Sequence, residues 1–566
     1  MEVTTFLLQL LRFFVDFVIA FVFVWLAARL AGKWSVRARV WSACYPADLA
    51  ILGLFAMALA GGISGLRPPL PRVHDEFSYL LAADTFAHGR LANPTHPMWQ
   101  HFETMHVIQQ PTYASKYPPG QGAVLALGKI LVGNPAVGLW LSCGVAVAAV
   151  VWMLQGWMPR RWALLGGLLT ALHPGIQLVW TQTYWGGNVA FIGGALVLGG
   201  YARLRRIPRC RDAVWMGVGL ALLANSRPFE GAVASLPVVL ALFSRPVRDR
   251  LALRSLSHRP LPVSGQWLTQ RIVPLVSVLG ITAIFMGYYN RRVTGDSWTL
   301  PYVVHENTYG ATPVFLWAQA GPMPGYRHAE IRQLHAWLRA SYSSQRTAPG
   351  FIEQKAIAFG QLWQFYLGVA LSFPFLALPW VLRRNCFWVP VAVVAAVGIA
   401  LLMTTWVNPH YAAPAAPALI LLAVAGLRHL RVFARRRGGR YPWMIQALVL
   451  AQLMGFLPDV WCHVAQRPDG FATRRAEILR QLETQAGRHL VIVRYGPEHN
   501  FHQEWVYNEA DIDSAKVVWA RSRHARADRR LAAYFADRRV WLLAADEEPV
   551  QLTPRKDVLA RRPPSR

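Results

Sequence analysis

Two adjacent carboxylates, Asp75 and Glu76, are the residues of this sequence best suited to acid–base chemistry. They closely follow an apolar stretch and begin a segment with helical periodicity, in which Phe77, Leu80 and Leu81 are expected to face lipid. A carboxylate at a membrane surface can remove a proton from an acceptor hydroxyl or ligate a hard divalent cation. An alternative stays open here: Asp75 caps the helix and Glu76 only favours its dipole.

Histidines are concentrated in the same part of the chain. Five of the 17 histidines lie within residues 74–106, namely His74, His88, His96, His101 and His106. Histidine is a common zinc ligand, but these gaps do not match compact ligand spacings and no cysteine is close. Polar loop histidines are therefore the simpler interpretation, with zinc binding as an alternative.

The composition indicates what must position these groups. Of 566 residues, 54% are hydrophobic and only 15% are charged, which argues against a soluble multi-domain enzyme. The longest windows without Asp, Glu, Lys or Arg are residues 130–159, 162–202, 356–382 and 385–427. The second and fourth of these are long enough for two spans each, because one span needs about 20 apolar residues.

Shorter apolar windows complete the set, at residues 17–28, 49–66, 213–226, 231–244, 272–290 and 441–458. Together the windows predict an all-α polytopic membrane bundle of about 12 transmembrane helices.

The basic residues predict how this bundle is oriented. There are 58 Lys and Arg against 29 Asp and Glu, a formal net charge of +29. In a soluble protein, such an excess of positive charge would indicate nucleic-acid binding. Cytoplasmic loops of membrane proteins, however, are also rich in Lys and Arg. The turns at 181–188, 225–231 and 407–410 are almost free of positive charge. We therefore expect an inner or plasma membrane protein with both termini outside the cytoplasm, and no nucleic-acid partner.

The chain divides into three predicted parts. Residues 1–45 hold an extra N-terminal transmembrane helix and a cytoplasmic loop. Residues 46–463 form the main transmembrane domain, with long outer loops at 67–134 and 291–356. From residue 464 to residue 566, polar helical stretches alternate with short apolar runs, which predicts a small α/β domain outside the membrane.

Four motifs carry a resemblance to a known family. The Asp75-Glu76 pair is followed by Lys-Tyr-Pro-Pro at 116–119, Asn-Ser-Arg-Pro at 225–228 and His-Tyr-Ala-Ala-Pro at 410–414. In this order and on one predicted side, they resemble the GT-C superfamily of polytopic glycosyltransferases, in the branch of protein O-mannosyltransferases and lipid A aminoarabinose transferases. The extra first helix, the residue inserted after the motif's lysine, and the tail domain depart from the family pattern.

The resemblance implies transfer of a sugar from a polyprenyl-phosphate carrier to an acceptor hydroxyl of a lipid or protein, outside the cytoplasm and with inversion. Asp75 would be the base, and Glu76 would support it or, with Asp75, hold a divalent cation such as Mg²⁺ or Mn²⁺. The negative charge that grows on the lipid phosphate needs fixed cations. The candidates for binding the substrate are Lys116, Tyr117, Arg227, Arg291, Arg292, His410 and Tyr411.

These candidates also have structural interpretations. Arg291 and Arg292 follow two tyrosines at the end of a span, where basic and aromatic residues commonly anchor the interface. Arg227 lies in a turn that otherwise avoids positive charge, so a functional role is as well supported as a structural one. His410 and Tyr411 lie in a turn between spans, where an interfacial tyrosine needs no further role.

Other functions remain open from the sequence alone. A polytopic transporter or flippase of a lipid-linked or small polar substrate would fit the number of spans, but a long outer loop with Asp75 suits an enzyme better than a rocking carrier. A membrane acyltransferase would need a histidine within the bundle, for which His173 is the candidate. A lipid-binding scaffold would need none of these groups.

Overall fold

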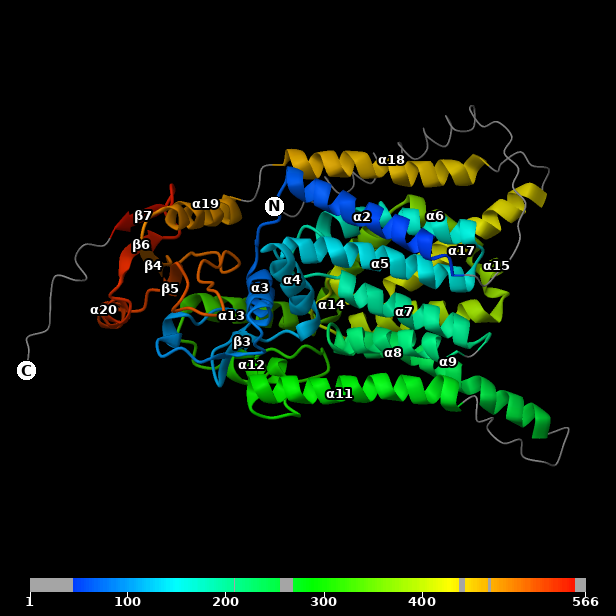
Figure 1. Cartoon of the computed structure of the whole chain (residues 1–566), viewed down its shortest axis with the longest axis horizontal. Coiled ribbons are helices and arrows are strands. Elements are labelled where there is room, and N and C mark those ends of the chain that lie inside the picture. Colours follow the sequence, from blue (N-terminus) through cyan, green and yellow to red (C-terminus); the bar gives the residue numbers. More distant parts are fainter. Residues whose placement is uncertain (1–43, 208, 255–267, 437–442, 467–469, 555–566) are drawn as a thin grey trace, which may run out of the picture.

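The computed structural model describes residues 44–207, 209–254, 268–436, 443–466 and 470–554. Figure 1 shows a bundle of roughly parallel helices with one end covered by shorter helices, loops and a small sheet. We call this covering part, residues 67–134, 295–347 and 470–554, the cap. The predicted span at 17–28 lies outside the described residues.

The bundle contains the long apolar helices. They are α2 (Pro46–Leu66), α5 (Ala136–Trp157), α6 (Arg160–Ala171), α7 (Asn188–Leu204), α8 (Cys210–Ala224), α9 (Pro228–Arg254), α11 (Val273–Thr294), α14 (Ala348–Tyr366), α15 (Leu378–Leu382), α16 (Trp388–Leu402), α17 (Ala416–Arg436) and α18 (Trp443–Ala465). Shorter helical turns join them: η2 (Gly175–Trp180), η3 (Leu268–Ile272), η4 (Ala370–Ala377), η5 (Asn385–Phe387) and η6 (Pro409–Tyr411). Local sequence sets several ends; α11, for example, has a proline in its first turn and stops at Gly295 with φ +87°.

Within the described residues, five helical segments are long and apolar enough to cross a membrane. They are Pro46–Leu66, Ala136–Trp157, Thr269–Thr294, Asn385–Leu402 and Ala416–Arg435. The predicted window 356–382 forms two helical segments bent by 93°, which count as a sixth span only if taken together. The bend lies at Gly368, whose φ of +54° a helix cannot accommodate. The chain is thus a membrane helix bundle, and the count of about 12 spans stays a prediction.

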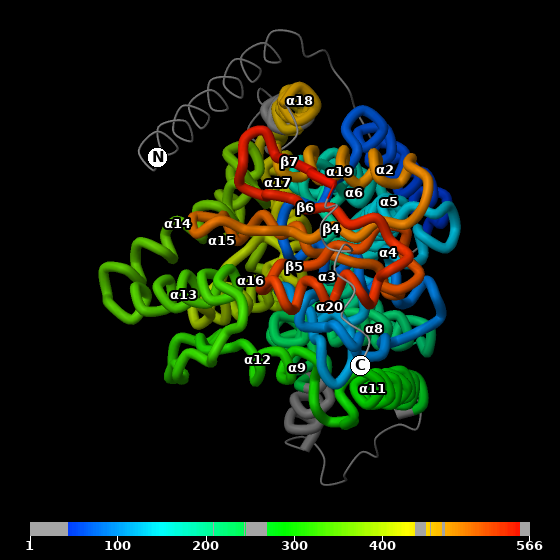
Figure 2. Tube along the Cα trace, turned by 90° about the vertical axis from the view of Figure 1, so that its left-hand side faces the viewer, coloured from blue at the N-terminus to red at the C-terminus, as the bar shows by residue number. Residues whose placement is uncertain are grey.

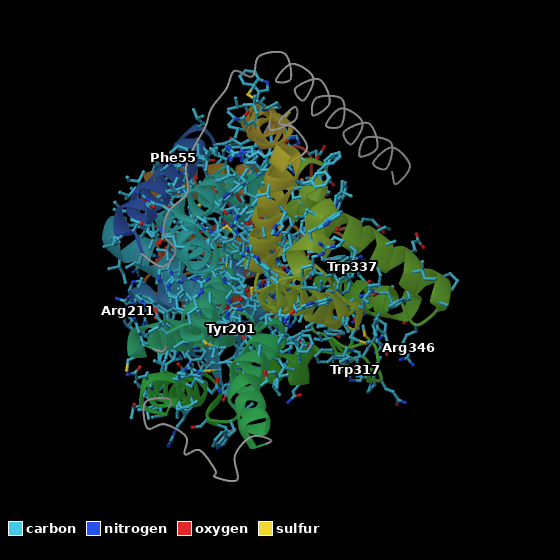
Figure 3. All side chains as sticks on the ribbon, turned by 90° about the vertical axis from the view of Figure 1, so that its right-hand side faces the viewer. Phe55, Tyr201, Arg211, Trp317, Trp337 and Arg346 are labelled. Atoms are coloured by element: carbon cyan, nitrogen blue, oxygen red, sulfur yellow. The ribbon has the colours of Figure 1, made fainter. Side chains whose placement is uncertain are left out.

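Small residues let the bundle helices approach one another. Gly53 of α2 faces Gly144 of α5, and a Cβ on Gly144 would lie 2.8 Å from the Gly53 carbonyl oxygen. Figure 3 shows Tyr201 of α7 inside the bundle and Phe55 of α2 on its flank, where the Phe55 side chain is exposed. The bundle therefore has an apolar interior and an apolar outer surface, as expected of helices in lipid.

The cap contains the remaining elements. From the first outer loop come α3 (His74–Ala87), β1 (Asn93–Pro94), η1 (Trp99–His101), β2 (Val107–Ile108), β3 (Thr112–Ser115) and α4 (Pro119–Val132). The second outer loop adds α12 (Pro301–Tyr309) and α13 (Ala329–Ser344). The C-terminal tail adds α19 (Gly470–Thr484), β4 (Arg488–Arg494), β5 (Val517–Arg521), α20 (Ala525–Tyr534), β6 (Arg538–Ala544) and β7 (Gln551–Pro554).

The tail folds as a four-stranded sheet in the order β5-β4-β6-β7. Strand β4 pairs in parallel with β5 and β6, and β7 pairs antiparallel to β6. Alternate residues of β4 face opposite sides: Leu490 packs toward α20, whereas Val491 packs toward α19. The sheet is thus covered by one helix on each face.

The tail shares its hydrophobic core with the first outer loop. Phe77 of α3 packs in the cluster with α19, and Leu81 of α3 packs in the cluster with α20. Their exposed fractions are 2% and 0%, so the expectation that they face lipid was wrong. The apolar face of α3 is buried by protein that lies almost four hundred residues later in the sequence, a cover that local periodicity cannot distinguish from lipid.

Both predicted outer loops and the tail gather at the same end of the bundle. In Figure 2 the tail elements lie in front of the bundle, with α12 and α13 beside them. The end of α5, the start of α6 and the end of α7 lie at the opposite end of the bundle in Figure 1. This grouping agrees with a two-sided topology, while the side that faces outward stays a prediction.

Candidate active site

A cluster of polar and charged side chains lies where the cap meets the bundle. Helix α3 contributes His74 and Asp75, and His106 comes from the residue directly before β2. The strand β3 ends directly before Lys116 and Tyr117, and the sharp start of α4 at Pro119 fixes the direction of this segment. The other contributors, from α12 and from turns of the bundle, are Tyr302, His305, Glu306, Arg227, His410 and Tyr411.

Asp75 is the centre of the cluster. The Tyr117 hydroxyl donates a short hydrogen bond to its Oδ1, and His74 Nδ1 lies 3.1 Å from its Oδ2. His106 Nε2 is 3.7 Å from Oδ1. Burial raises the pKa of Asp75, but the charge of His106 and the hydrogen bonds of His74 and Tyr117 hold the pKa well below its usual range. The side chain keeps 27% of its surface exposed, so Asp75 is an ionised carboxylate that a substrate can reach.

Glu76, its neighbour, points elsewhere. Its Oε1 accepts a hydrogen bond of 3.0 Å from the Arg72 backbone N–H, and its Oε2 accepts one of 2.9 Å from the Tyr184 backbone N–H. The residue is 1% exposed. Burial raises the pKa of Glu76 to about 7, against the effect of these two donors. Glu76 thus links the start of α3 to the turn after η2. Among its described contacts there is none with Asp75 that would support the predicted role.

Lys116 carries the first cation of the cluster. Its Nζ lies 3.4 Å from Glu306 Oε1, and it lies over the rings of Tyr302 at 4.9 Å and Tyr117 at 5.6 Å. Burial raises the pKa of Glu306, but the charge of Lys116 and the neighbouring His305 lower it to about 2. Glu306 and His305 could not be selected from the sequence, because a single His-Glu pair in a polar loop has no distinctive spacing.

Arg227 carries the second cation. Its guanidinium lies 4.4 Å from the centre of the Tyr411 ring. Burial raises the pKa of Tyr79, the charge of Arg227 lowers it and that of Asp75 raises it, so both charges lie within electrostatic reach of this hydroxyl. Across the described parts of the chain, no carboxylate forms an ion pair with Arg227 within 4.0 Å. Its planar fork is therefore available to an anionic ligand.

His410 and Tyr411 line the same region from η6. Their rings pack edge to face at 4.7 Å, and the Trp185 ring lies 5.3 Å from that of His410. Asp75, Lys116 and Tyr117 thus form one contact group, and Arg227, His410 and Tyr411 form another. The charges of Asp75 and Arg227 both act on the pKa of Tyr79. Arg291 and Arg292 differ: both are exposed in the last turn of α11, and their predicted part in substrate binding remains without a described contact to the cluster.

A cation could be held by a different set from the predicted one. Ligand atoms of His74, Asp75 and His106 all lie within 4.8 Å of one another. His74 Nδ1 and His106 Nε2 both face the Asp75 carboxylate, at 3.1 Å and 3.7 Å. Two imidazoles and one carboxylate suit zinc better than Mg²⁺ or Mn²⁺, which prefer oxygen. The predicted pair of Asp75 and Glu76 is not this set.

His106 adopts an unusual backbone conformation at this place. Its φ is +61°, in the left-handed region that favours glycine. The Ser78 hydroxyl donates a hydrogen bond of 2.7 Å to the His106 carbonyl, and the Lys116 N–H donates one of 3.2 Å to the same oxygen. A backbone held this way directs the imidazole toward Asp75, and such strain concentrates at functional sites.

No protein-family model and no curated protein matches the sequence. Several solved structures are similar to it, of which two are described here. The crystal structure of ArnT from Cupriavidus metallidurans bound to undecaprenyl phosphate has a TM-score of 0.46 and 13% identity, over 82% of this chain and 86% of that chain. The crystal structure of the Archaeoglobus fulgidus oligosaccharyltransferase in complex with zinc and sulfate has a TM-score of 0.44 and 12% identity, over 79% and 60%.

Proposed function

We propose that this protein is an inverting membrane glycosyltransferase, which moves a sugar from a polyprenyl-phosphate carrier to an acceptor hydroxyl with Asp75 as the base. The observation that supports it most is the pairing of a reachable, ionised carboxylate with two cations at the end of an apolar helix bundle. Base and phosphate site must meet at this level, because a lipid-linked donor keeps its tail in the bilayer and its sugar phosphate at the headgroup plane.

The proposed chemistry is a single displacement. The acceptor oxygen attacks the anomeric carbon opposite the phosphate, the glycosidic bond to phosphate breaks, and the hydroxyl proton passes to Asp75, so the configuration inverts. A carboxylate with a lowered pKa is a weak base. Proton transfer therefore accompanies bond formation, when the attacking hydroxyl has become acidic. The contacts of Tyr117 and His74 orient the carboxylate for this step.

The leaving phosphate needs its charge neutralised as the bond breaks. Arg227, which has no carboxylate within 4.0 Å among the described residues, is the cation best placed to donate two hydrogen bonds at once. Lys116 is paired with Glu306, so a phosphate must share Lys116 with that carboxylate or displace it. We therefore assign the main phosphate contact to Arg227, and a supporting one to Lys116.

The carrier tail has a route to this cluster. An apolar groove of about 270 Å³ lies between α3, α4 and α11. Its wall includes Pro119, three residues after Lys116, and the exposed side chains of Leu127, Ile130 and Phe285. An isoprenoid chain lying in the groove would reach from bilayer lipid to the phosphate cations while burying apolar surface.

A divalent cation, if bound, would be held by His74, Asp75 and His106 and would supply Lewis acidity near the acceptor oxygen. The acceptor, a lipid or a protein of the cell envelope, would approach from the cap. In this proposal the cap faces outward from an inner or plasma membrane. The N-terminus and the C-terminus lie outside the cytoplasm.

The test is a reconstituted assay with radiolabelled polyprenyl-phosphate sugars and, in parallel, radiolabelled free sugars. A glycosyltransferase releases unlabelled polyprenyl phosphate and moves the label to an acceptor or to water. Accumulation of intact labelled donor in the opposite leaflet, or of free sugar inside the vesicles, would instead establish the transporter or flippase. If neither bond cleavage nor uptake is observed, both functions are excluded.

A further inference from the structure

The C-terminal tail reaches the catalytic cluster through one side chain. His502 lies in the segment between β4 and β5, and its Nδ1 is 3.3 Å from His74 Nε2. The two ring planes are inclined by only 19°, which suits a hydrogen bond between ring nitrogens. His502 and His74 are separated by more than four hundred residues in the sequence, so this contact exists only because the tail folds over α3.

The His502 ring is held from several directions. The edge of Trp337, from α13, meets it at 5.3 Å and 87°, and the neighbouring Phe501 ring lies 4.3 Å away. The His502 backbone N–H donates to Asn500 Oδ1 at 3.1 Å. Figure 3 shows Trp337 on the flank from which α13 projects. Residues of the second outer loop and of the tail therefore fix one imidazole against His74.

The geometry of His74 makes this contact consequential. Its Nε2 faces His502, and its Nδ1 faces Asp75 Oδ2 at 3.1 Å. If His502 donates to Nε2, the Nδ1–H of His74 points at the carboxylate. If His74 donates through Nε2, its Nδ1 lone pair is directed at the place where a cation would lie. In both tautomers, the bond to His502 sets the angle of the ring that touches Asp75.

We infer that His502 is a positioning residue of the active centre: through the Nδ1–Nε2 contact it fixes the ring angle and tautomer of His74, and thereby the carboxylate of Asp75. The inference rests on the proposed function for its role in catalysis, but not for the contact itself. It makes the tail domain part of the active site, since removing one tail imidazole loosens the orientation of the base.

The test compares three single variants in the full-length, reconstituted protein. His502→Ala removes the contact, and His502→Asn keeps an amide that can donate or accept. His524→Ala is the matched control, because His524 belongs to the same domain and caps α20 but contacts no residue described above as part of the cluster. Two quantities are measured: kcat and KM for sugar transfer, and the affinity for Zn²⁺ by calorimetry.

Loss of a residue that orients a metal ligand or base typically costs about 10–100-fold in affinity or activity. We expect His502→Ala to lower kcat or Zn²⁺ affinity by about tenfold or more, with KM for the donor little changed. His502→Asn should recover most of this loss, and His524→Ala should change neither quantity. A merely structural role would instead lower stability and leave kcat and Zn²⁺ affinity per folded molecule intact, which would overturn the inference.

The two measurements separate the inference from the proposed function. If the wild type binds Zn²⁺ but transfers no sugar, the proposed function fails, and the fall in Zn²⁺ affinity still decides the role of His502. If the wild type transfers sugar without binding Zn²⁺, the fall in kcat decides the role of His502. A wild type that does neither has no centre for His502 to position, and the inference falls with it.

Discussion

The interior of the bundle and the interior of the cap are held together by different kinds of contact. The interior of the bundle is filled by apolar side chains and close helix contacts, as between Gly53 and Gly144. The cap buries charges in pairs: Arg521 contacts Glu504 at 2.6 Å and Glu330 at 2.7 Å. Loss of one partner of such a pair leaves a buried charge unpaired. A substitution at a bundle contact instead destabilises the fold through a steric clash or a cavity. In the proposed site, the cap therefore supplies the carboxylate of Asp75 and the cation of Lys116, and the bundle supplies their position and a second cation, Arg227.

The substitution with the largest expected effect is Asp75→Asn in the cap. The amide keeps the shape of the side chain but cannot take the proton of an acceptor hydroxyl, and a general base typically contributes ~10²–10⁴-fold. We expect transfer of radiolabel to fall by about a thousandfold. Donor binding, followed by equilibrium retention of labelled lipid, should remain. Transfer within a few-fold of the wild-type rate would show that Asp75 is not the base.

Arg227→Leu tests the phosphate contact that the turn between α8 and α9 adds to the site. Loss of one fixed donor to a developing anion costs about a hundredfold or more in kcat. Arg227→Lys should recover only part of the rate, because it keeps the charge but loses the planar fork and the stacking on Tyr411. Arg291→Leu, in the exposed last turn of α11, should lose less than Arg227→Leu. Equal losses would mean that the end of α11 contributes to phosphate binding as much as Arg227 does.

Gly144→Val tests the bundle. A Cβ at this position meets the carbonyl oxygen of Gly53 at 2.8 Å, and backbone cannot yield as a flexible side chain can. Overpacking of this kind costs about 1–3 kcal/mol, so the Tm in detergent should fall. The kcat of the molecules that remain folded should stay close to that of the wild type. An unchanged Tm would mean that α2 and α5 do not approach as closely as described.

Glu76→Gln tests a part of the cap that contacts the bundle but not the substrate. The amide group can accept only one of the two backbone N–H bonds, and an unsatisfied buried donor costs about 1–3 kcal/mol. Activity per folded molecule should fall far less than in Asp75→Asn. A loss as large as that of Asp75→Asn would give Glu76 a direct part in the chemistry.

Glu76 also predicts a pH dependence of stability. Because burial raises its folded pKa to about 7, above the unfolded value, its protonated form is favoured by folding. This contribution is complete below the unfolded pKa and is lost as the pH rises through about 7. The Tm advantage of wild type over Glu76→Gln should therefore shrink as the pH rises from about 5 to about 8. An advantage that grows over this range would contradict the raised pKa.

Ala123→Trp should have the smallest effect. Ala123 lines the apolar groove from its exposed side, so an indole there obstructs the path of the carrier tail without filling the core. We expect KM for a long polyprenyl donor to rise by about threefold, less than 1 kcal/mol, with kcat unchanged. A donor with a short tail should be unaffected. Equal effects on both donors would mean that the tail lies elsewhere.

The bundle was largely predictable because hydropathy is a local property. The apolar windows at 49–66 and 130–159 contain most of α2 and α5, since about 20 apolar residues are a sufficient signal by themselves. The bend in the window 356–382 was not predicted, because it depends on the left-handed backbone of Gly368. No periodicity reports that conformation.

The cap was predictable only in its residue types. The motifs selected Asp75 and Lys116 in the cap, but Glu306 and His502 were missed, because their contacts join segments 190 and 428 residues apart. Glu76 shows a different failure. Successive side chains on a helix point about 100° apart, and on α3 this turns Glu76 toward the backbone N–H groups of Arg72 and Tyr184. The pairing of Asp75 and Glu76 in the sequence does not reveal this, because His74, the other neighbour of Asp75, does face the site.

The central claim is that the lipid phosphate binds beside Arg227 and Lys116, next to Asp75. Photo-crosslinking with a polyprenyl phosphate that carries a photoreactive group near its phosphate tests it most directly. The account predicts crosslinks in peptides that contain Lys116 and Arg227, lost when unlabelled polyprenyl phosphate is added in excess. Crosslinks confined to the opposite end of the bundle, around residues 159–161 and 203–207, would contradict it.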